Sequence, residues 1–505
     1  MKKIALIYPI EKKYQNPSYS MTQLGIGYIA SYVEQFGHTV DIFDFPLMNI
    51  DENQMLEKIK ELNYDIIGIS TYNYNYEIAV KLTIKIQRLR PSCFIIMGGY
   101  QPTLEYERMQ GVFSYVDCLI IGEGEKAFAN ICNNLENNSW QNTPGIVFLD
   151  NGQLTATGKS DIITDLDNIP WPKRTVFSKK MNMITMRGCY GQCSFCCKNA
   201  FQKLCNANLT RRRSPEDVVN EIEFLVNNGA YTIQFNDDTF EISSINSQRW
   251  VDRFISLVKE KHLHFEFRCF FRTKDIIGQH SRIKQLIEIG LVNIYVGIES
   301  FVASALELYN KRITPEENIK AFQILDELNI SYDYGFILFN PYTTPEDILH
   351  TIYIFEKYKF NDKNRWVMPR NLSKTVLLAY HQTPIYDFLS EQDMIDKTKL
   401  EYQWIDRRTE EIFEIQQIYQ KTMDQAYQYY REDKIENEEL EKTYKAIFHV
   451  LFQLDLNFLK DITLIVMDSN KTEHEIKWQC NEVLQQYKEK ILSITKKLES
   501  LSKML

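Results

Sequence analysis

Short apolar runs alternate with amphipathic helical patterns along most of this chain of 505 residues, and this alternation constrains the fold more than any other feature. The runs in the first 145 residues are apolar throughout, which is typical of parallel strands buried on both faces of a sheet. The pattern therefore predicts an α/β fold that begins with a doubly wound, Rossmann-like domain over 1–145. Its predicted strands are 3–8, 38–43, 65–70, 93–97 and 117–121, and its predicted helices are 25–36, 53–61, 77–89 and 125–135.

Small and turn-forming residues follow several of these strands, where the ligand of a doubly wound domain binds. Glycines at such positions let the backbone approach a bulky ligand closely, although ordinary strand-to-helix turns use them too. No GxGxxG motif follows the first strand, so a dinucleotide is disfavoured. The candidate ligand-binding residues at these strand ends are Ser70, Thr71, Gly98, Gly99, Gly122 and Glu123.

The segment 146–180 is predicted to connect this domain to the next. Asn151-Gly152 is a strong turn signal between two short apolar runs, which predicts a hairpin. The prolines at 170 and 172 then prevent regular structure locally.

A second alternating series spans 181–380. Three of its predicted helices begin alike, at Ser214, Thr314 and Thr344, each followed by proline and acidic residues. The hydroxyl can cap the helix, and proline and acids suit its first turn. Repeated strand–helix units predict a partial (β/α) barrel of the TIM type, with its chemistry at the carboxyl ends of the strands.

Four of the ten cysteines lie within nine residues, directly after the first predicted barrel strand. Cys189, Cys193 and Cys196 could converge on one metal centre, and thiolates select zinc, copper(I) or iron–sulfur clusters. A structural zinc site usually has four ligands in two pairs, which neither Cys197 nor Cys205 completes. Zinc is thus disfavoured but stays an alternative, whereas three thiolates on a four-iron cube leave one iron open for substrate chemistry.

The three cysteines, with an aromatic residue before the last, resemble the signature of radical S-adenosylmethionine (SAM) enzymes. The resemblance implies that they hold a [4Fe-4S] cluster whose open iron binds SAM. Reductive cleavage of SAM would give a 5′-deoxyadenosyl radical, which removes a hydrogen atom from the substrate. The resemblance assigns SAM contacts to Phe195, to Asp237 and Asp238 near the amino group, to Arg268 and Arg272 near the carboxylate, to Glu299 on the ribose side, and to Phe339 near the adenine.

The glycine-rich strand ends of the first domain resemble the cobalamin-binding domain that precedes the barrel in one large subgroup of these enzymes. The resemblance assigns cobalamin contacts to Gly25, Ser70, Thr71, Gly98, Gly99, Tyr100, Gln101, Gly122 and Glu123. Many corrinoid proteins ligate cobalt from below through Asp-x-His-x-x-Gly, and this motif does not occur in the sequence. We therefore expect base-off cobalamin with no lower histidine ligand, or else a sheet domain that has lost its corrinoid.

The resemblance covers about residues 1–380. The region 381–505 contains long helical stretches, and the last carries an apolar stripe from Ile476 to Leu505 at steps of three and four residues. In the subgroup, this region commonly shapes the substrate pocket.

The resemblance favours a cobalamin-dependent enzyme that methylates an unactivated carbon of a natural product, a peptide or a small metabolite. The alternative with the same cofactors is radical rearrangement, cyclisation or oxidation without methyl transfer. A further alternative is a non-catalytic iron–sulfur or zinc protein. Methylthio transfer to tRNA is disfavoured, because it would need a second set of cysteines and Cys93, Cys118 and Cys132 are dispersed.

Charge and composition limit the partners. The chain has 58 basic and 67 acidic residues, for a net charge of −9, which disfavours nucleic-acid binding as its main task. The one basic run, 211–213, suits a cofactor or surface role as well as RNA. No apolar run approaches the about 18 residues of a membrane span, and the first is too short for a signal peptide, so we expect a cytoplasmic protein. Radical SAM chemistry would also need a one-electron donor such as flavodoxin or ferredoxin.

Overall fold

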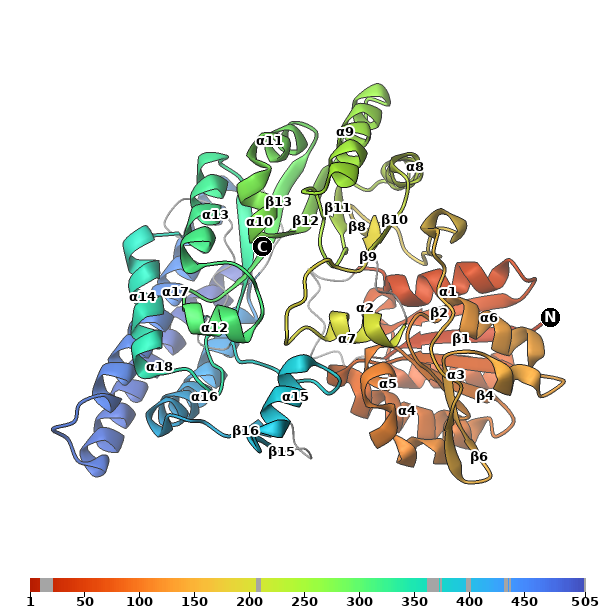
Figure 1. The fold of residues 1–505 in the computed structure, drawn as a ribbon, viewed down its shortest axis with the longest axis horizontal. Helices are drawn as coiled ribbons and strands as arrows, with labels where there is room; N and C mark the ends of the chain where they lie inside the picture. The colour runs from red at the N-terminus through yellow and green to blue at the C-terminus, as the bar shows by residue number, and fades with distance from the viewer. Residues whose placement is uncertain are drawn as a thin grey trace.

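The computed structural model describes residues 1–9, 21–205, 210–360, 372, 375–396, 401–430, 435 and 437–503. Figure 1 shows an N-terminal α/β domain in red to orange, a central barrel region in green and long C-terminal helices in blue. The predicted fold class is thus confirmed.

The N-terminal domain is built on a seven-stranded sheet with the order β2-β1-β3-β4-β5-β6-β7. The first five strands along the chain are parallel, and the last two are antiparallel to their neighbours. Because the strand order reverses between β1 and β3, a crevice is expected at the carboxyl ends of these strands. The strands are β1 (Lys3–Tyr8), β2 (Thr39–Asp44), β3 (Ile66–Ser70), β4 (Phe94–Gly98), β5 (Cys118–Ile120), β6 (Ile146–Asp150) and β7 (Gln153–Ala156).

Helices cover both faces of this sheet, as the fully apolar strands predict. Ile4 and Leu6 of β1 pack in one core with α1 and α6, while Ala5 and Ile7 pack in another with α3 and α4. The helices of this domain are α1 (Leu24–Glu34), α2 (Phe45–Met48), α3 (Glu52–Leu62), α4 (Tyr76–Leu89), α5 (Tyr100–Glu105) and α6 (Glu125–Asn134).

The hairpin β6–β7 is part of the N-terminal sheet rather than of a connector. Its turn residues Asn151 and Gly152 have φ of 46° and 82°, as a tight hairpin turn with two left-handed positions requires. Ile146 and Phe148 are buried against Trp140 in the same core as α1 and α6. The predicted hairpin is confirmed, but its apolar face extends the domain beyond the expected boundary at residue 145.

The central region contains five parallel strands that lie in chain order across one open sheet, β14-β13-β12-β11-β8. Helices connect the strands, which gives a partial (β/α) barrel. A short antiparallel pair, β9 (Met186–Arg187) with β10 (Arg211–Arg212), follows the first strand. The sequence predicts that first strand over 183–186, but it ends earlier, at Met183. The barrel elements are β8 (Lys180–Met183), α8 (Pro215–Asn227), β11 (Thr232–Phe235), α9 (Ile245–Glu260), β12 (Glu266–Arg272), α10 (Thr273–Gly278), α11 (His280–Glu288), β13 (Leu291–Glu299), α12 (Ala303–Leu308), α13 (Pro315–Glu327), β14 (Ser331–Phe336) and α14 (Pro345–Tyr358).

Three barrel helices begin as the sequence predicts. The side chains of Ser214, Thr314 and Thr344 each accept a hydrogen bond from the backbone N–H three residues further on, and proline occupies the first turn. These caps fix where the strand-end loops finish.

The C-terminal region is mostly helical, as predicted. The last helix buries Cys480, Tyr487, Ile491 and Leu498 against the two long helices before it, while Leu505 of the predicted stripe lies outside the described residues. Within the described ranges, no helix is long and apolar enough to cross a membrane. The elements are α15 (Pro384–Glu391), β15 (Ile395–Asp396), β16 (Glu401–Tyr402), α16 (Arg407–Tyr427), α17 (Glu438–Val466) and α18 (Glu473–Ser502).

Candidate functional site

The cysteine-containing loop, residues 188–196, runs from β9 to α7 (Cys197–Leu204) and is held from two sides. The Ser194 hydroxyl donates to the carbonyl of Leu308 at 2.6 Å, and its N–H donates to the carbonyl of Tyr309 at 3.0 Å. The N–H of Ile385, in the C-terminal region, donates to the carbonyl of Ser194 at 3.0 Å. The loop conformation therefore depends on both the barrel and the C-terminal region.

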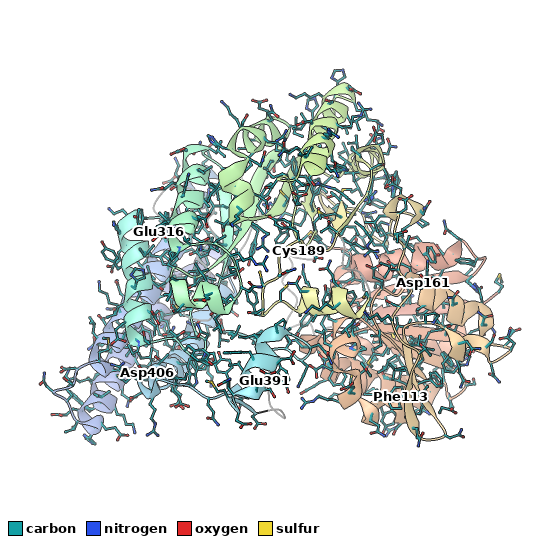
Figure 2. The ribbon with its side chains drawn as sticks, viewed as in Figure 1. Phe113, Asp161, Cys189, Glu316, Glu391 and Asp406 are labelled. Atoms are coloured by element: carbon teal, nitrogen blue, oxygen red, sulfur yellow. The ribbon has the colours of Figure 1, made fainter. Side chains whose placement is uncertain are left out.

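Cys189, Cys193 and Cys196 all lie on this loop, and Figure 2 labels Cys189 at the centre of the molecule, between the two sheets. Cys193 is buried and the other two are partly exposed. Burial raises the pKa of Cys189, and it raises that of Cys196 to about 12. A bound cationic centre is therefore needed to hold these groups as thiolates at neutral pH.

The arrangement of donors fits a cluster better than a single ion. Among the described residues, no three His, Cys, Asp or Glu side chains lie close enough together to bind one metal ion, which weakens the zinc alternative. Thiolates around a four-iron cube bind different irons and lie further apart. Three loop cysteines with no fourth ligand thus fit a cube with one open iron.

Arg272, at the end of β12, reaches into the loop. Its Nη1 lies 3.9 Å from Sγ of Cys189 and 3.7 Å from Sγ of Cys193. The guanidinium also lies over the ring of Tyr190, 5.0 Å from its centroid. A Cβ atom at Gly191 would lie 1.5 Å from Nη1, so a larger residue at 191 would displace the guanidinium from this position.

Alternate residues of β12 face the open interior of the barrel. Arg268, Phe270 and Arg272 share that partly exposed face, while Phe267 and Phe271 are buried in the core on the other side. The two arginines predicted to meet the SAM carboxylate thus lie on the same face, and Arg272 is the one beside the cysteine loop.

Asp237 is enclosed and structural. Its carboxylate accepts hydrogen bonds from the N–H of Thr185 at 2.6 Å, from the Thr185 hydroxyl at 2.5 Å and from the N–H of Met186 at 3.1 Å. Burial raises its pKa to about 6 despite these hydrogen bonds. Asp237 fixes the chain where β8 gives way to β9, which explains the early end of the first strand.

Asp238 faces the opposite way, into a cleft. It accepts a hydrogen bond from the N–H of Gly188 at 3.0 Å, and its other oxygen pairs with Nζ of Lys198 at 2.5 Å. All three residues line the cleft described below. Of the two predicted amino-group contacts, Asp238 is the one placed to meet a ligand.

Glu299 lies at a bulge at the end of β13 with φ of 64°. Its carboxylate pairs with Nζ of Lys311 at 3.3 Å, and the same ammonium donates to the carbonyl of Gly297 at 2.8 Å. The side chain is held at the strand end on the barrel's inner face.

The two predicted aromatic contacts are packed against protein. Phe339 is fully buried, with Trp404 and Phe413 at centroid distances of 6.2 Å and 5.2 Å. Phe195 packs edge-on against Tyr309 at 5.5 Å. Neither lines the large cleft, so the structure does not bring them together with Asp238.

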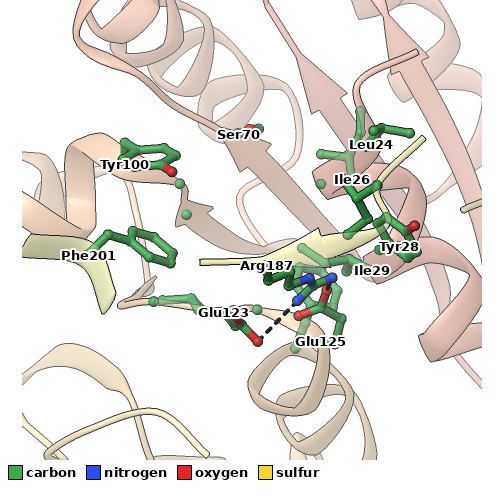
Figure 3. A pocket seen from close by; sticks show the side chains of 18 of the residues that line it. Leu24, Ile26, Tyr28, Ile29, Ser70, Tyr100, Glu123, Glu125, Arg187 and Phe201 are labelled. Atoms are coloured by element: carbon green, nitrogen blue, oxygen red, sulfur yellow. Dashed lines mark hydrogen bonds and ion pairs between the residues drawn. The ribbon is translucent and has the colours of Figure 1, made fainter. Parts of the chain in front are cut away.

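A large cleft opens at the carboxyl ends of β1, β3, β4 and β5, with about 1290 Å³ of empty space that extends to open solvent (Figure 3). This position is the crevice that the reversal of strand order predicts. Seven of the nine predicted cobalamin contacts line it: Gly25, Ser70, Gly98, Gly99, Tyr100, Gly122 and Glu123.

The other two predicted contacts, Thr71 and Gln101, shape the turns behind the cleft. The Thr71 hydroxyl donates to the carbonyl of Gly98 at 2.9 Å, and the Thr71 carbonyl accepts from the N–H of Gln101 at 3.2 Å. Gly99 has φ of 108°, and a Cβ there would lie 2.4 Å from the Thr71 carbonyl oxygen. Glycine at 99 is therefore required for the backbone conformation of this part of the cleft wall.

Buried ion pairs join the two domains at the floor of the cleft. Arg187 pairs with Glu123 at 3.0 Å and with Glu125 at 2.5 Å (Figure 3). Arg211 also pairs with Glu123. Burial alone would raise the pKa of Glu123, but the two guanidinium groups hold it below its usual value. Glu123 is thus engaged by the barrel. Sequence reasoning missed both arginines, although Arg211 begins the basic run.

Aromatic rings form a further part of the cleft wall. Tyr72 and Tyr100 stack at 5.6 Å, and Phe201 of α7 lies 4.8 Å from Tyr100. All three line the cleft, so its wall is continuous from the N-terminal sheet to the helix that follows the cysteine loop.

Two family models match the chain in its two sheet regions. One is described as the B12 binding domain and matches residues 15–132, and the other is described as the radical SAM superfamily and matches residues 183–352. The chain belongs to the cobalamin-binding radical SAM enzymes. The resemblance predicted from the sequence is thus confirmed.

Several known proteins are similar to this one. A protein of Pyrococcus horikoshii named as an uncharacterized methyltransferase is 27% identical over 346 residues, which cover 66% of this chain and 73% of that protein. The anaerobic magnesium-protoporphyrin IX monomethyl ester cyclase of Rubrivivax gelatinosus is 25% identical over 359 residues, which cover 68% of this chain but only 63% of the cyclase. The relatives therefore include both a methyltransferase and a cyclase.

The fold has a close counterpart among solved structures. The cobalamin-dependent S-adenosylmethionine radical enzyme OxsB, with aqua-cobalamin and S-adenosylmethionine bound, superposes with a TM-score of 0.76 at 15% identity. The match covers 99% of this chain and 79% of OxsB. The C-terminal helices thus belong to the shared architecture. The cofactors of OxsB agree with those predicted from the sequence.

Proposed function

We propose that this enzyme methylates an unactivated carbon of a small-molecule or peptide substrate with the help of cobalamin and SAM. The observation that carries the proposal is the single cleft between the two domains. The strand ends of the N-terminal sheet form one wall, and Gly188, next to Cys189, lies on the other wall with Lys198 and Asp238. A substrate in this cleft would face both cofactor sites.

In this proposal Cys189, Cys193 and Cys196 hold the [4Fe-4S] cluster and Asp238 receives the amino group of SAM. Arg268, Arg272 and Glu299 line the barrel interior on the side of the carboxylate and ribose. When bound, the cluster would supply the electron that cleaves SAM, and cobalamin would supply the methyl group. A flavodoxin or ferredoxin would supply electrons to the cluster.

The corrin would lie along the glycine-rich strand ends of the N-terminal sheet. Gly98 and Gly99 expose backbone there, and Tyr72 and Tyr100 present flat aromatic faces. This arrangement suits a large, flat, amide-bearing ligand better than a small polar one. The absence of the Asp-x-His-x-x-Gly motif supports base-off binding with no lower histidine.

We propose that the region 381–505, with the segment just before it, closes the cleft and shapes the substrate pocket. Nδ2 of Asn73, in the N-terminal domain, donates to the hydroxyl of Tyr380 at 2.9 Å. Nδ1 of His381 lies 2.5 Å from Oε1 of Glu105 in α5. These two contacts join the segment to the sheet domain, and the hydrogen bond from the N–H of Ile385 to the carbonyl of Ser194 joins it to the cysteine loop.

Cyclisation, rearrangement or oxidation with the same cofactors is the second candidate function. The similarity to the Rubrivivax cyclase favours it, just as the similarity to the Pyrococcus methyltransferase favours methylation. Both candidates require the same two cofactors in one cleft, so product chemistry must separate them.

The test is anaerobic reconstitution with iron, sulfide and cobalamin, followed by dithionite and methyl-labelled SAM. We expect 5′-deoxyadenosine, S-adenosylhomocysteine, and label on the corrin even without substrate. Cys193→Ala should lose the brown absorbance and 5′-deoxyadenosine together, whereas Cys480→Ala, in the C-terminal helix α18, should keep both.

Two results would decide against the proposal at different levels. No 5′-deoxyadenosine from an iron-loaded protein would refute radical SAM chemistry. 5′-Deoxyadenosine without label on the corrin or on any product would refute methyl transfer and favour the second candidate. Candidate substrates are best drawn from the pathway of neighbouring genes, because enzymes of one pathway often lie together.

A further inference from the structure

Arg272 is held beside two of the cluster cysteines by contacts that do not involve SAM. Its guanidinium lies against the Cα of Gly191 and over the ring of Tyr190, within 3.7 Å and 3.9 Å of the Cys193 and Cys189 sulfurs. A longer residue than glycine at 191 would push the guanidinium away from both sulfurs. The loop is thus built to admit this cation.

A second set of contacts fixes the same arginine from behind. The hydroxyl of Tyr190 donates to Oδ2 of Asp275 at 2.6 Å, and the backbone N–H of Arg272 lies 3.4 Å from the same oxygen. The hydroxyl of Ser243 donates to the other oxygen of Asp275. Asp275 is fully buried, so it holds in place both the ring of Tyr190 and the end of β12, from which Arg272 projects.

The sulfur of a cysteine that ligates iron can still accept a hydrogen bond. The reduction potential of an iron–sulfur cluster depends on net charge and on hydrogen bonds to its sulfurs. The reduced cluster carries one more negative charge than the oxidised one, so a cation and N–H donors at two thiolates stabilise the reduced state. Arginine suits this task because it stays charged and its donors are fixed in a planar fork.

We propose that Arg272 raises the reduction potential of the cluster by donating hydrogen bonds to the sulfurs of Cys189 and Cys193. This role differs from the carboxylate contact that family resemblance implies, because it acts before SAM binds. It rests on the proposed function only in requiring that the three cysteines hold a cluster.

The test is a potentiometric titration of the reconstituted cluster without SAM, followed by electron paramagnetic resonance. Arg272→Met should shift the midpoint potential to more negative values at unchanged iron content. Arg312→Met is the matched control, since Arg312 contacts the same loop through the side chain of Gln192 at 2.9 Å, and its shift should be much smaller. Arg272→Lys, which keeps the charge but not the fork, should give an intermediate potential.

Each contrary outcome points to a different error. A wild-type protein that assembles no cluster refutes the proposed function itself. A cluster with the same potential in Arg272→Met, together with weaker SAM binding, shows that Arg272 serves the SAM carboxylate and overturns the inference. If neither Arg272 variant retains iron, Arg272 is required for cluster assembly, and potential tuning as its role is likewise overturned.

Discussion

Arg187→Met offers a direct test of the ion pairs that join the sheet domain to the barrel. The side chains of Arg187, Glu123 and Glu125 are only 16%, 11% and 6% exposed. Removal of one partner from a buried ion pair costs about 3–5 kcal/mol, because a charge is left without compensation. Glu123 still pairs with Arg211 in the variant, whereas the ion pair of Glu125 is lost. We therefore expect the free energy of unfolding to fall by about 3 kcal/mol, at the lower end of this range.

Urea unfolding followed by tryptophan fluorescence would measure the loss, with the first transition compared between proteins. Glu125→Gln in the Arg187→Met background removes the stranded charge and should restore part of the stability, which a double-mutant cycle quantifies. Lys477→Met breaks an exposed pair with Glu473 and should leave the midpoint unchanged. A loss below about 1 kcal/mol in Arg187→Met would refute the reasoning, since that is the range of a surface ion pair.

Three further predictions concern the cleft and its support. Gly99→Val should lower the cobalt content and leave iron unchanged in metal analysis, because any Cβ at 99 meets the Thr71 carbonyl. The Lys198→Met variant should bind SAM more tightly in equilibrium dialysis, because Asp238 is no longer paired with the Lys198 ammonium and is free to bind the amino group of SAM. Asp237 has a pKa raised from 3.8 to about 6, so the folded state binds its proton more tightly than the unfolded state does. Its ionisation therefore costs stability as pH rises from about 4 to about 6, and Asp237→Asn should lose less stability than wild type over that range in urea unfolding.

Contrary results are equally specific. An unchanged ratio of cobalt to iron would exclude the wall at residue 99 from the corrin site. Weaker SAM binding after loss of Lys198 would mean that this lysine assists SAM rather than competing with it. Parallel pH profiles for the wild type and Asp237→Asn would show that the pKa of this carboxyl is the same in the folded and unfolded states.

Local patterns in the sequence were sufficient to predict individual strands and turns and the position of the cysteine loop. The fully apolar run at 3–8 predicts β1, and the Asn151-Gly152 pair predicts the hairpin turn. Spacing alone predicts that three cysteines share a loop after a barrel strand. Each of these inferences rests on residues within one element, where short-range sterics and burial decide the outcome.

Contacts between distant segments could not be predicted in this way. Glu123 pairs with arginines that lie 64 and 88 positions further along the chain, and nothing near it in the sequence indicates them. Asp237 and Asp238 are adjacent acids that point in opposite directions, one into the fold and one into the cleft. Phe339 packs on Phe413 of α16 and on Trp404 just before that helix, and both partners lie far from it along the chain.

The hydrogen bond from Ile385 to the carbonyl of Ser194 also limits how this protein can be dissected. A shortened version that stops after the last barrel strand would keep all three sulfur ligands, yet it would release one of the tethers that give their loop its shape. Iron incorporation by such a fragment would report on the missing tether as much as on the ligands. Work on the iron site therefore calls for the full-length polypeptide.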